Sequence, residues 1–273
     1  MLALALALFP AMMTAQTNCE DGNDPVNPAG PIGLTVQDVI NRFSARESIF
    51  QQARNNYTYT QDLTVQTIEG KTVDGEFREA RDITYDAKGA PVETVTYAPT
   101  NTLSRITLTK TDYDDIRHRI PFVLTTENLP LYKVSYIGQQ HLDEIDTYVF
   151  DQSPKNIESG KRYFEGRVWV DNRDFQIVKT CGRTVPDVIA EDKSKNPVRE
   201  NLSPVFVTYH EQIDGVYWFP TYARADEVLH FSSGDVHVRE IIKYTKYKRS
   251  GSKTKIIFHG EKPAEKPAVQ KKR

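Results

Sequence analysis

The feature that most limits how this chain can fold is an alternation of apolar and polar residues with a period of two. In the stretch YTYTQDLTVQT, residues 57–67, the apolar residues are Tyr57, Tyr59, Leu63 and Val65, and the residues between them are polar. Successive side chains of a β-strand point to opposite faces, so this pattern predicts a strand with one buried and one solvated face. Such strands are typical of antiparallel sheets that pack one face on the core.

The same alternation recurs along most of the chain. GEFREARDITYD, residues 75–86, places Phe77, Ile83 and Tyr85 on one face and charged residues on the other. Gly, Pro, Asn and Asp separate the candidate strands at hairpin spacing. About a dozen strands with few helices between them predict a mainly β chain of the α+β class, built on a large antiparallel sheet. The further candidate strands are 92–98, 102–109, 131–138, 145–151, 162–171, 174–182, 204–213, 216–228, 235–248 and 253–259.

Two segments break the alternation and predict helices. Residues 35–54 begin with Thr35, which can cap the helix while Asp38 reaches back to complete a capping box. Residues 111–124 carry acidic residues first and basic residues later, which suits the helix dipole, and Pro121 is expected to end or kink this helix. The apolar side of this second helix consists of Tyr113, Ile116, Ile120 and Phe122.

The ends of the chain predict export. The apolar run near the N-terminus is shorter than the roughly 20 residues that span a bilayer, and it matches a secretory signal over residues 1–15. Residues 16–34 have the composition of a linker, and residues 35–259 form a single predicted domain. The Lys/Pro-rich tail, residues 260–273, is predicted to be disordered. We therefore expect a soluble exported protein.

The chain has only two cysteines, Cys19 and Cys181. An oxidising compartment would permit them to form a disulfide. A buried cysteine also serves as a small apolar side chain, which is the alternative for Cys181. The sequence leaves both states open.

Charge and motifs exclude several functional classes. The formal net charge is −2, so the chain has no overall basic field to attract nucleic acid. Basic residues over 243–255 interleave with Tyr244 and Tyr247, which in an exported chain suits a protected sheet edge better than single-strand binding. No G-x-S-x-G, P-loop, H-E-x-x-H or C-x-x-C motif occurs. We predict a non-enzymatic protein with no cofactor, no metal site and no nucleic-acid partner.

The acidic segment DNRD, residues 171–174, is a candidate for a metal loop or a catalytic pair of carboxylates. Pairing the apolar-rich runs on either side places Val170 opposite Phe175 and Phe164 opposite Cys181, with all four side chains on one face. In this register the acidic residues lie at the hairpin end, where Asp and Asn satisfy backbone groups of turns. The acidic segment is therefore predicted to be a turn.

Three stretches of the sequence resemble a known family. YTYTQDLTVQT, GRVWVDNRDFQIVKTCGR and EQIDGVYWFPTYARAD follow an export signal and an amphipathic helix, and they are similar to strands of the periplasmic lipoprotein carrier and receptor group (LolA/LolB-like). The resemblance covers residues 35–259. It implies an incomplete β-barrel of about 11 strands, closed by the N-terminal helix and the mid-chain helix. It also implies a periplasmic location and a hydrophobic cavity that receives lipoprotein acyl chains.

The resemblance further implies a lid and its gate. Helix 111–124 would form part of the lid. The nearest candidates for the arginine that gates the carrier's lid are Arg78 and Arg81, which lie on opposite faces of one predicted strand. The residues before Cys19 do not form a lipid-attachment motif, so the resemblance does not extend to a membrane-anchored receptor.

The first functional hypothesis is a periplasmic carrier that holds lipoprotein acyl chains or another lipid, within outer-membrane lipoprotein sorting. A curved sheet with only two helices to cover it leaves an apolar concavity, and acyl burial contributes about 0.8 kcal/mol per methylene. Lid movement would expose or cover this face. The predicted lining is Leu63, Val65, Phe77, Ile83, Tyr85, Val168, Val170, Phe175 and Ile177.

Three other interpretations stay open at this point. The same residues would also form a closed core without any ligand. The same fold could serve a periplasmic sensor or regulator that binds a protein, including a membrane-protein partner. A hydrolase whose site lacks a recognised motif is the third.

Overall fold

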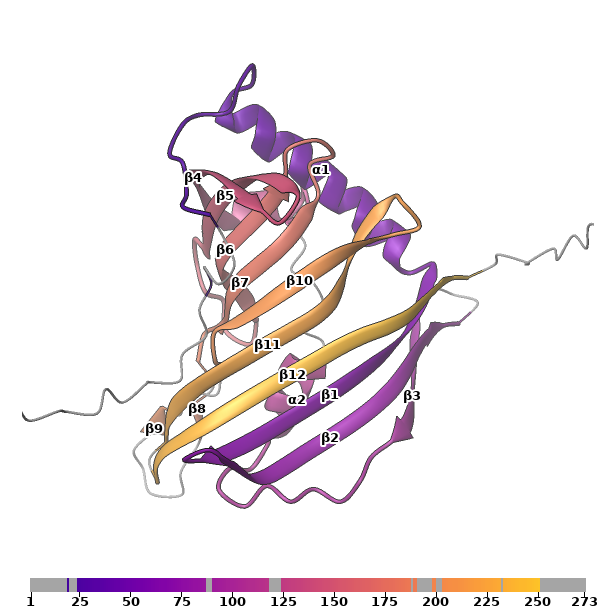
Figure 1. Cartoon of the computed structure of the whole chain (residues 1–273), viewed down its shortest axis with the longest axis vertical. Helices are drawn as coiled ribbons and strands as arrows, with labels where there is room; N and C mark the ends of the chain where they lie inside the picture. The colour runs from indigo at the N-terminus through magenta and orange to yellow at the C-terminus, as the bar shows by residue number, and fades with distance from the viewer. Residues whose placement is uncertain are drawn as a thin grey trace, which may run out of the picture.

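The computed structural model describes residues 24–86, 90–117, 124–187, 203–231 and 233–250, together with Cys19 and the pairs 189–190 and 198–199. Ten strands of this part form one antiparallel sheet in the order β3-β2-β1-β12-β11-β10-β7-β6-β5-β4 (Figure 1). They are β1 (Tyr57–Glu69), β2 (Thr72–Tyr85), β3 (Pro91–Tyr97), β4 (Tyr132–Leu142), β5 (Ile145–Pro154), β6 (Tyr163–Asp171), β7 (Ile177–Val185), β10 (Phe206–Ile213), β11 (Tyr217–Phe231) and β12 (Gly234–Arg249). The short strands β8 (Ile189–Ala190) and β9 (Val198–Arg199) pair separately.

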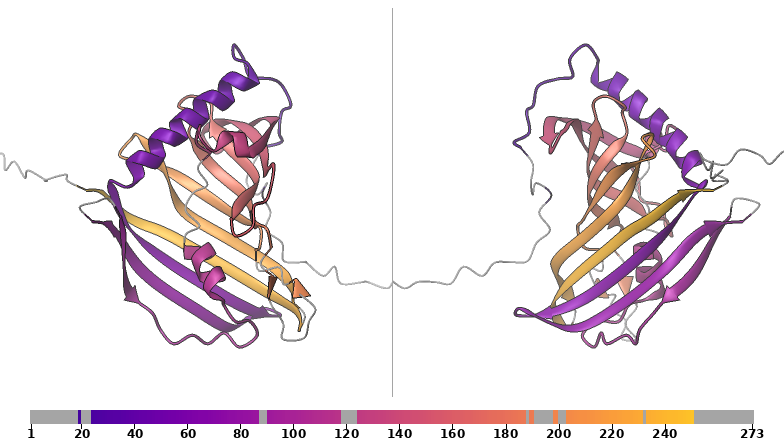
Figure 2. Two further views of the ribbon diagram at one scale, coloured as in Figure 1. Left: turned by 180° about the vertical axis from the view of Figure 1, so that it is seen from behind. Right: turned by 45° about the vertical axis from the view of Figure 1, so that its right-hand side comes forward.

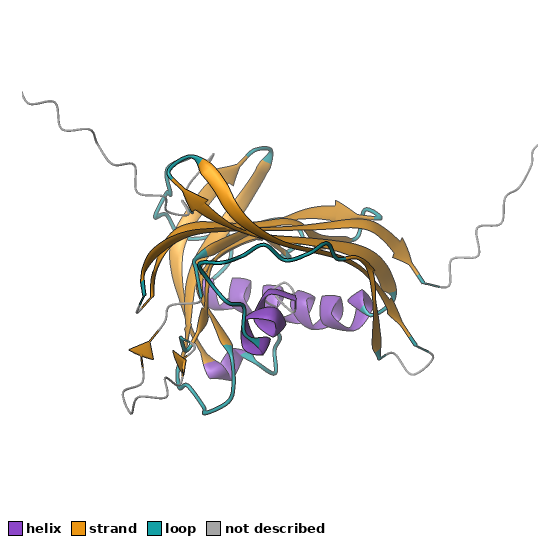
Figure 3. Cartoon of the chain, turned by 90° about the horizontal axis from the view of Figure 1, so that it is seen from below, coloured by secondary structure: helices purple, strands orange, loops and turns teal. Residues whose placement is uncertain are grey.

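The sheet arches over two helices, α1 (Val36–Arg54) and α2 (Lys110–Arg117), which both lie on its concave side (Figure 3). A single 3-10 turn, Leu129–Leu131, precedes β4. Strands β3 and β4 are the two edges and do not pair with each other, so the barrel is incomplete. Seen from behind, α1 runs from the β4–β7 half of the sheet toward β11 and β1, while α2 lies over β12 and β1 (Figure 2). The predicted fold class, a mainly β half-barrel with two covering helices, is confirmed.

Helix α1 forms where the sequence predicts it. The Thr35 hydroxyl accepts a hydrogen bond from the Asp38 backbone N–H at 3.0 Å, and the Asp38 carboxylate accepts one from the Thr35 N–H at 3.0 Å. This capping box satisfies two backbone donors that a helix N-terminus would otherwise leave unpaired. Val39, Phe43 and Phe50 turn the apolar side of α1 into the core.

Helix α2 begins at Lys110, one residue before the predicted start, and the structure describes it to Arg117, whereas residues 118–123 of the predicted helix lie outside the described residues. A second capping box explains its start: the Thr109 backbone N–H donates to the Asp112 carboxylate at 2.7 Å, and the Asp112 N–H donates to the Thr109 hydroxyl at 3.2 Å. Asp112 therefore caps the first turn, as expected for a helix start, whereas Asp114 and Asp115 pair with Lys110 and Arg162. Two of the predicted lid residues, Ile120 and Phe122, lie outside the described residues.

The predicted strand 102–109 is wrong, because these residues pair with no strand of the sheet. The segment is tied to β2 by one backbone hydrogen bond, from Thr102 N–H to the Glu76 carbonyl at 2.9 Å. Its apolar residues Leu103, Ile106 and Leu108 pack against the core on the concave side. The alternation that suggested a strand reflects burial against the sheet rather than pairing within it. Candidate strand 253–259, the signal over residues 1–15 and the tail over 260–273 lie outside the described residues.

The predicted register of β6 and β7 is wrong. Val170 lies opposite Ile177 rather than Phe175, and a bulge next to Trp169 shifts the rest of the ladder. Phe175 has a left-handed backbone, with φ at 59°, and so leaves the ladder and joins the turn. The shift also places Cys181 opposite Arg167, on the outer face of the sheet and away from Phe164.

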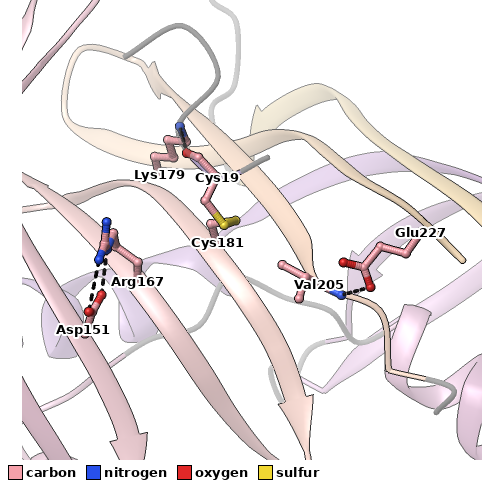
Figure 4. Close-up of a disulfide and its surroundings, with 7 residues drawn as sticks. All are labelled: Cys19, Asp151, Arg167, Lys179, Cys181, Val205 and Glu227. Carbon is pink, nitrogen blue, oxygen red and sulfur yellow. Dashed lines mark hydrogen bonds and ion pairs between the residues drawn. A yellow bond between two sulfur atoms is a disulfide. The ribbon is translucent and has the colours of Figure 1, made fainter. Parts of the chain in front are cut away.

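Cys181 forms a disulfide with Cys19, with 5.6 Å between the two Cα atoms (Figure 4). The bond holds Cys19 against the outer face, where the Lys179 ammonium donates to the Cys19 carbonyl at 2.8 Å. Lys179 also lies over the ring of Trp169, with 4.6 Å between its Nζ and the ring centroid. Farther along the same segment, Asn27 exchanges two backbone hydrogen bonds with Gln139 and so covers part of the β4 edge. The disulfide, which the sequence left open, is formed.

A close approach of β6 and β7 provides a test of this packing. Gly182 faces Gly166, and a Cβ on Gly182 would lie 2.2 Å from the Glu165 carbonyl oxygen. We expect Gly182→Ala to push the strands apart and to cost about 1–3 kcal/mol, a fall in Tm of about 3–10 °C. Gly30→Ala is the matched control, because a methyl group on its Cα would meet no heavy atom within 4 Å. Equal melting temperatures of the two variants would contradict the tight packing.

Candidate functional site

The concave face carries two apolar clusters. The α1 cluster lies beneath α1 and includes Phe43, Phe150 and Ala225, whereas the α2 cluster lies beneath α2 and includes Ile116 and Ala223. Ala223 and Ala225 are two residues apart on β11, so both clusters lie on the same face of the sheet. The concave face is therefore one apolar surface covered in two parts.

The predicted lining residues divide between these two clusters. Leu63, Val65 and Phe77 belong to the α2 cluster, and the predicted lid residues Tyr113 and Ile116 pack against them. The rings of Phe77 and Tyr113 meet edge to face, with centroids 5.1 Å apart. Helix α2 therefore covers the part of the lining that β1 and β2 provide.

The other predicted lining residues lie elsewhere on the same face. Val168, Val170 and Ile177 are buried in the α1 cluster, and Phe175 packs against it. Ile83 is buried beside Tyr59 in the β1–β2 ladder. Tyr85 lines a small pocket between the end of α1 and the strands β1, β2, β11 and β12. The sequence thus identified the correct face, but the structure divides the residues into two covered groups and one pocket.

A polar cluster ties the end of α2 to the concave face, and we call it the α2 latch: Gln61, Glu79, Arg81 and Arg117. The Arg81 guanidinium donates to the backbone carbonyl of Arg117, the last residue of α2, at 2.7 Å. The Gln61 amide donates to the same carbonyl at 3.2 Å, and its oxygen accepts from Arg81 Nε at 2.7 Å. Arg117 in turn pairs with Glu79, with 2.6 Å between nitrogen and oxygen. These contacts satisfy the carbonyl that the helix end would leave free.

Three residues of the α2 latch, Gln61, Glu79 and Arg81, are buried, Arg117 is partly exposed, and the latch is incompletely satisfied. Arg81 is 3% exposed, and burial lowers the pKa of its guanidinium, while the nearby Glu93 carboxylate opposes this shift. Within the described chain, Glu79 Oε1 and Arg117 Nε are buried and make no hydrogen bond. Buried polar atoms without partners are costly, so the latch holds α2 with less free energy than its contacts alone suggest.

Arg78, the other candidate for a gating arginine, lies on the opposite face of β2. Its guanidinium pairs with Asp62 on the outer face at 3.0 Å and lies over the ring of Tyr97. The two arginines of this strand thus make separate contacts, and of the two only Arg81 contacts α2. The sequence alone left both arginines as candidates for the gating residue.

Two titratable side chains are buried beneath α1. The Glu47 carboxylate accepts a hydrogen bond from the Ile177 N–H at 3.3 Å, and burial raises its pKa to about 8. His210 interacts with the backbone of Val178 on the neighbouring strand β7, and burial lowers the pKa of its imidazole to about 4. Both groups are therefore neutral near pH 7. Glu47 follows Phe43 by one helical turn on the buried side of α1, and that placement was the sequence signal for its burial.

The acidic segment at residues 171–174 forms a turn, as predicted. The Asp171 carboxylate accepts from the Arg173 N–H at 2.6 Å, and the Asp174 carboxylate accepts from the Gln176 N–H at 3.1 Å. Asp174 also accepts from the Trp218 indole N–H at 2.9 Å. Both carboxylates serve the turn and its neighbour β11.

Across the described ranges, no group of three or more His, Cys, Asp or Glu side chains is arranged to hold a metal ion. Neither α1 nor α2 combines the length and the apolar character that a membrane crossing requires, and no other helix does so in the part of the chain described here.

No family model and no curated protein matches the sequence. Several solved structures are similar to this chain, among them the following three. A DUF1329 family protein from Desulfovibrio piger is 14% identical, with 82% of this chain and 95% of that chain covered and a TM-score of 0.39. A putative outer membrane lipoprotein-sorting protein domain from Vibrio parahaemolyticus is 11% identical, with 78% and 94% covered and a TM-score of 0.35.

The third is a LolA superfamily protein from Nitrosomonas europaea, 13% identical, with 75% of this chain and 93% of that chain covered and a TM-score of 0.31. Structures of the group that the sequence resembles are thus among those similar to this chain. At these identities and TM-scores the likeness carries no argument about function. The function is argued below from the residues of this chain.

Proposed function

We propose that this chain is a non-enzymatic periplasmic binding protein that holds lipoprotein acyl chains or another lipid on its concave face, within outer-membrane lipoprotein sorting. The observation that carries the proposal is that a short helix covers an apolar surface through a polar, incompletely satisfied latch. Apolar packing alone would favour a permanently closed core. A buried polar latch is costly to maintain and supports a cover that opens.

In this proposal α2 moves away from β1 and β2 and exposes Leu63, Val65 and Phe77 to an acyl chain. The chain then replaces the contacts that Tyr113 and Ile116 make in the closed state. Each buried methylene contributes about 0.8 kcal/mol, so a chain of a dozen or more methylenes offsets the loss of the latch. Arg81 acts as a positioning residue that sets how often α2 opens.

Arg81→Leu tests this mechanism. Loss of its charge-assisted hydrogen bonds is expected to populate the open state and to tighten the binding of a fluorescent fatty-acid probe by roughly tenfold. Arg78→Leu is the matched control, because Arg78 lies on the outer face of the same strand and is expected to leave the affinity unchanged. Fluorescence titration measures both, and thermal melting checks that both variants fold.

Extraction of the purified wild-type protein with organic solvent, followed by mass spectrometry, tests the function itself. Co-purified lipid supports the proposal. Lipid-free protein that takes up no probe, in both the wild type and Arg81→Leu, would contradict it.

One observation favours a second candidate, a periplasmic sensor or regulator that binds a protein. All seven residues of the edge strand β3 are exposed, including Val92, Val95 and Tyr97. An exposed edge strand can add an extended segment of a partner by backbone pairing. Site-specific crosslinking from Val95 would recover a partner protein, including a membrane protein, if this candidate is correct.

A further inference from the structure

A small aromatic pocket adjoins the α2 cluster, and the proposed function does not explain its polar groups. It lies at the C-terminal end of α1, beside β1, β2 and the β11–β12 pair. The rings of Tyr59 and Tyr247 pack at a tilt with their centroids 5.3 Å apart, and the Phe219 ring lies 4.8 Å from that of Tyr247 by the same measure. The walls are thus aromatic rings in mutual contact, which fixes the shape of the pocket.

One guanidinium faces these rings. Arg54, the last residue of α1, lines the pocket and forms no hydrogen bond or ion pair with any residue that the structure describes. Burial lowers its pKa, and the hydroxyls of Tyr59 and Tyr85 are near enough to act on it electrostatically. A partly buried guanidinium without a protein partner loses part of its hydration and receives no acceptor in return.

The nearest acidic group does not neutralise Arg54. Glu47 lies two helical turns earlier on α1, and its carboxylate is protonated below about pH 8 because it is buried. Its oxygen is already directed at the Ile177 N–H. Near neutral pH, therefore, the pocket contains a positive charge without a counter-charge, together with the phenol groups of four tyrosines.

The pocket is small. Its cavity volume is about 30 Å³, whereas one water needs about 10–15 Å³. This space suits the two oxygens of a carboxylate better than a phosphodiester headgroup with its substituents. A carboxylate is also the planar acceptor that a guanidinium binds with two parallel hydrogen bonds.

The pocket is continuous with the apolar face. Tyr59, Tyr244 and Tyr247 line the pocket and also belong to, or pack against, the α2 cluster. Along β1 the distance from Tyr59 to Val65 is roughly 20 Å at the usual rise of a strand. That length is comparable with an extended long acyl chain. A ligand with its acidic end at Arg54 would therefore lay its chain under α2.

We infer that this pocket binds the free carboxylate of a long-chain fatty acid, through Arg54 with Tyr59 and Tyr85, while the chain occupies the concave face. The inference rests on the proposed function and names its ligand: a free acid rather than the esterified chains of a lipoprotein.

Calorimetric titration with palmitate, methyl palmitate and hexadecyl phosphate tests the inference on the full chain. The wild type is expected to bind palmitate about tenfold more tightly than methyl palmitate, as one charge-assisted interaction would give. Arg54→Gln is expected to lose this preference and to keep its affinity for methyl palmitate within about twofold. Arg46→Gln, an exposed site on the same helix, is the control and is expected to behave as the wild type.

Each contrary result has a distinct meaning. Equal affinity of the wild type for palmitate and methyl palmitate, or an equal loss of both in Arg54→Gln, would overturn the carboxylate site and leave the lipid-binding function standing. Tighter binding of hexadecyl phosphate than of palmitate would overturn it in favour of a phosphate ligand. Binding of none of the three by the wild type would overturn both this inference and the proposed function.

Discussion

Replacing Glu47 with glutamine is expected to stabilise the fold by about 4 kcal/mol at pH 8 and by less than about 1 kcal/mol at pH 5. The carboxyl group is buried beneath α1, and its pKa rises from 4.5 to about 8 in the folded chain. Between these pH values the unfolded chain releases a proton that the folded chain retains. Stability is therefore complete below pH 4.5 and is lost as the pH rises toward 8. Glutamine keeps the acceptor for the Ile177 N–H and carries no ionisable group.

Urea unfolding of the wild type and Glu47→Gln at several pH values measures this effect. Glu144→Gln is the control, because Glu144 is exposed and its replacement should shift stability equally at both pH values. With Glu47 absent, the titration of His210 should become visible. The pKa of its imidazole falls from 6.5 to about 4, so the stability of the variant should decline as the pH falls through that interval. A variant no more stable than the wild type at pH 8 would show that Glu47 ionises freely in the folded state.

Loss of the Cys19–Cys181 disulfide is expected to lower the melting temperature by about 5–15 °C. The bond joins residues 162 positions apart, and a crosslink over so long a loop restricts the unfolded chain by about 2–5 kcal/mol. In the folded chain it also holds the Cys19 carbonyl over the Lys179 ammonium. The double variant Cys19→Ser/Cys181→Ser removes the bond without leaving a reactive thiol.

Thermal melting with and without a reductant distinguishes the effect of losing the disulfide from the effect of replacing the cysteine side chains. The reduced wild type should melt with the double variant, and the reductant should leave the variant unchanged. Because the bond lies on the outer face, we expect the affinity for a fatty-acid probe to be the same in both proteins. If the reduced wild type, with both thiols shown to be free by chemical titration, melts at the same temperature as the oxidised wild type, the disulfide does not constrain the unfolded chain.

The sequence predicted the sheet, its concave face and α1 because these depend on local patterns. The alternation in β1 and β2 and the capping box at Thr35 are each complete within a few residues. The register of β6 and β7 failed because a left-handed residue and a bulge look no different in sequence from a regular strand. Phe175 was placed on the correct face for the wrong reason, since it reaches the α1 cluster from the turn.

The site was predicted less completely than the fold. The role of Arg81 depends on its meeting the carbonyl of Arg117, which is far from it along the chain. Arg54 and Tyr59 gave no signal at all, because a helix that ends in arginine is ordinary and an alternating tyrosine is typical of a strand. Segment 102–109 shows the opposite error. Its pattern predicted a strand, but its apolar residues pack on the sheet without pairing with any strand. Contacts between distant segments decide these features, and one sequence does not display them.

The order of strands in the sheet has a consequence for how the chain folds. Strand β1 is the first strand along the chain, and it lies between β2 and β12 in the sheet. Strand β12 is the last strand of the sheet along the chain. By contrast, β4 to β7 are joined in sequence and pair with their immediate neighbours. The β4–β7 region can therefore form early from local hairpins, whereas the seam between β1 and β12 needs the strands of the sheet that are first and last along the chain. Closing this seam is expected to limit the folding rate, and until then Tyr57, Tyr59 and Val65 of β1 remain exposed to other chains.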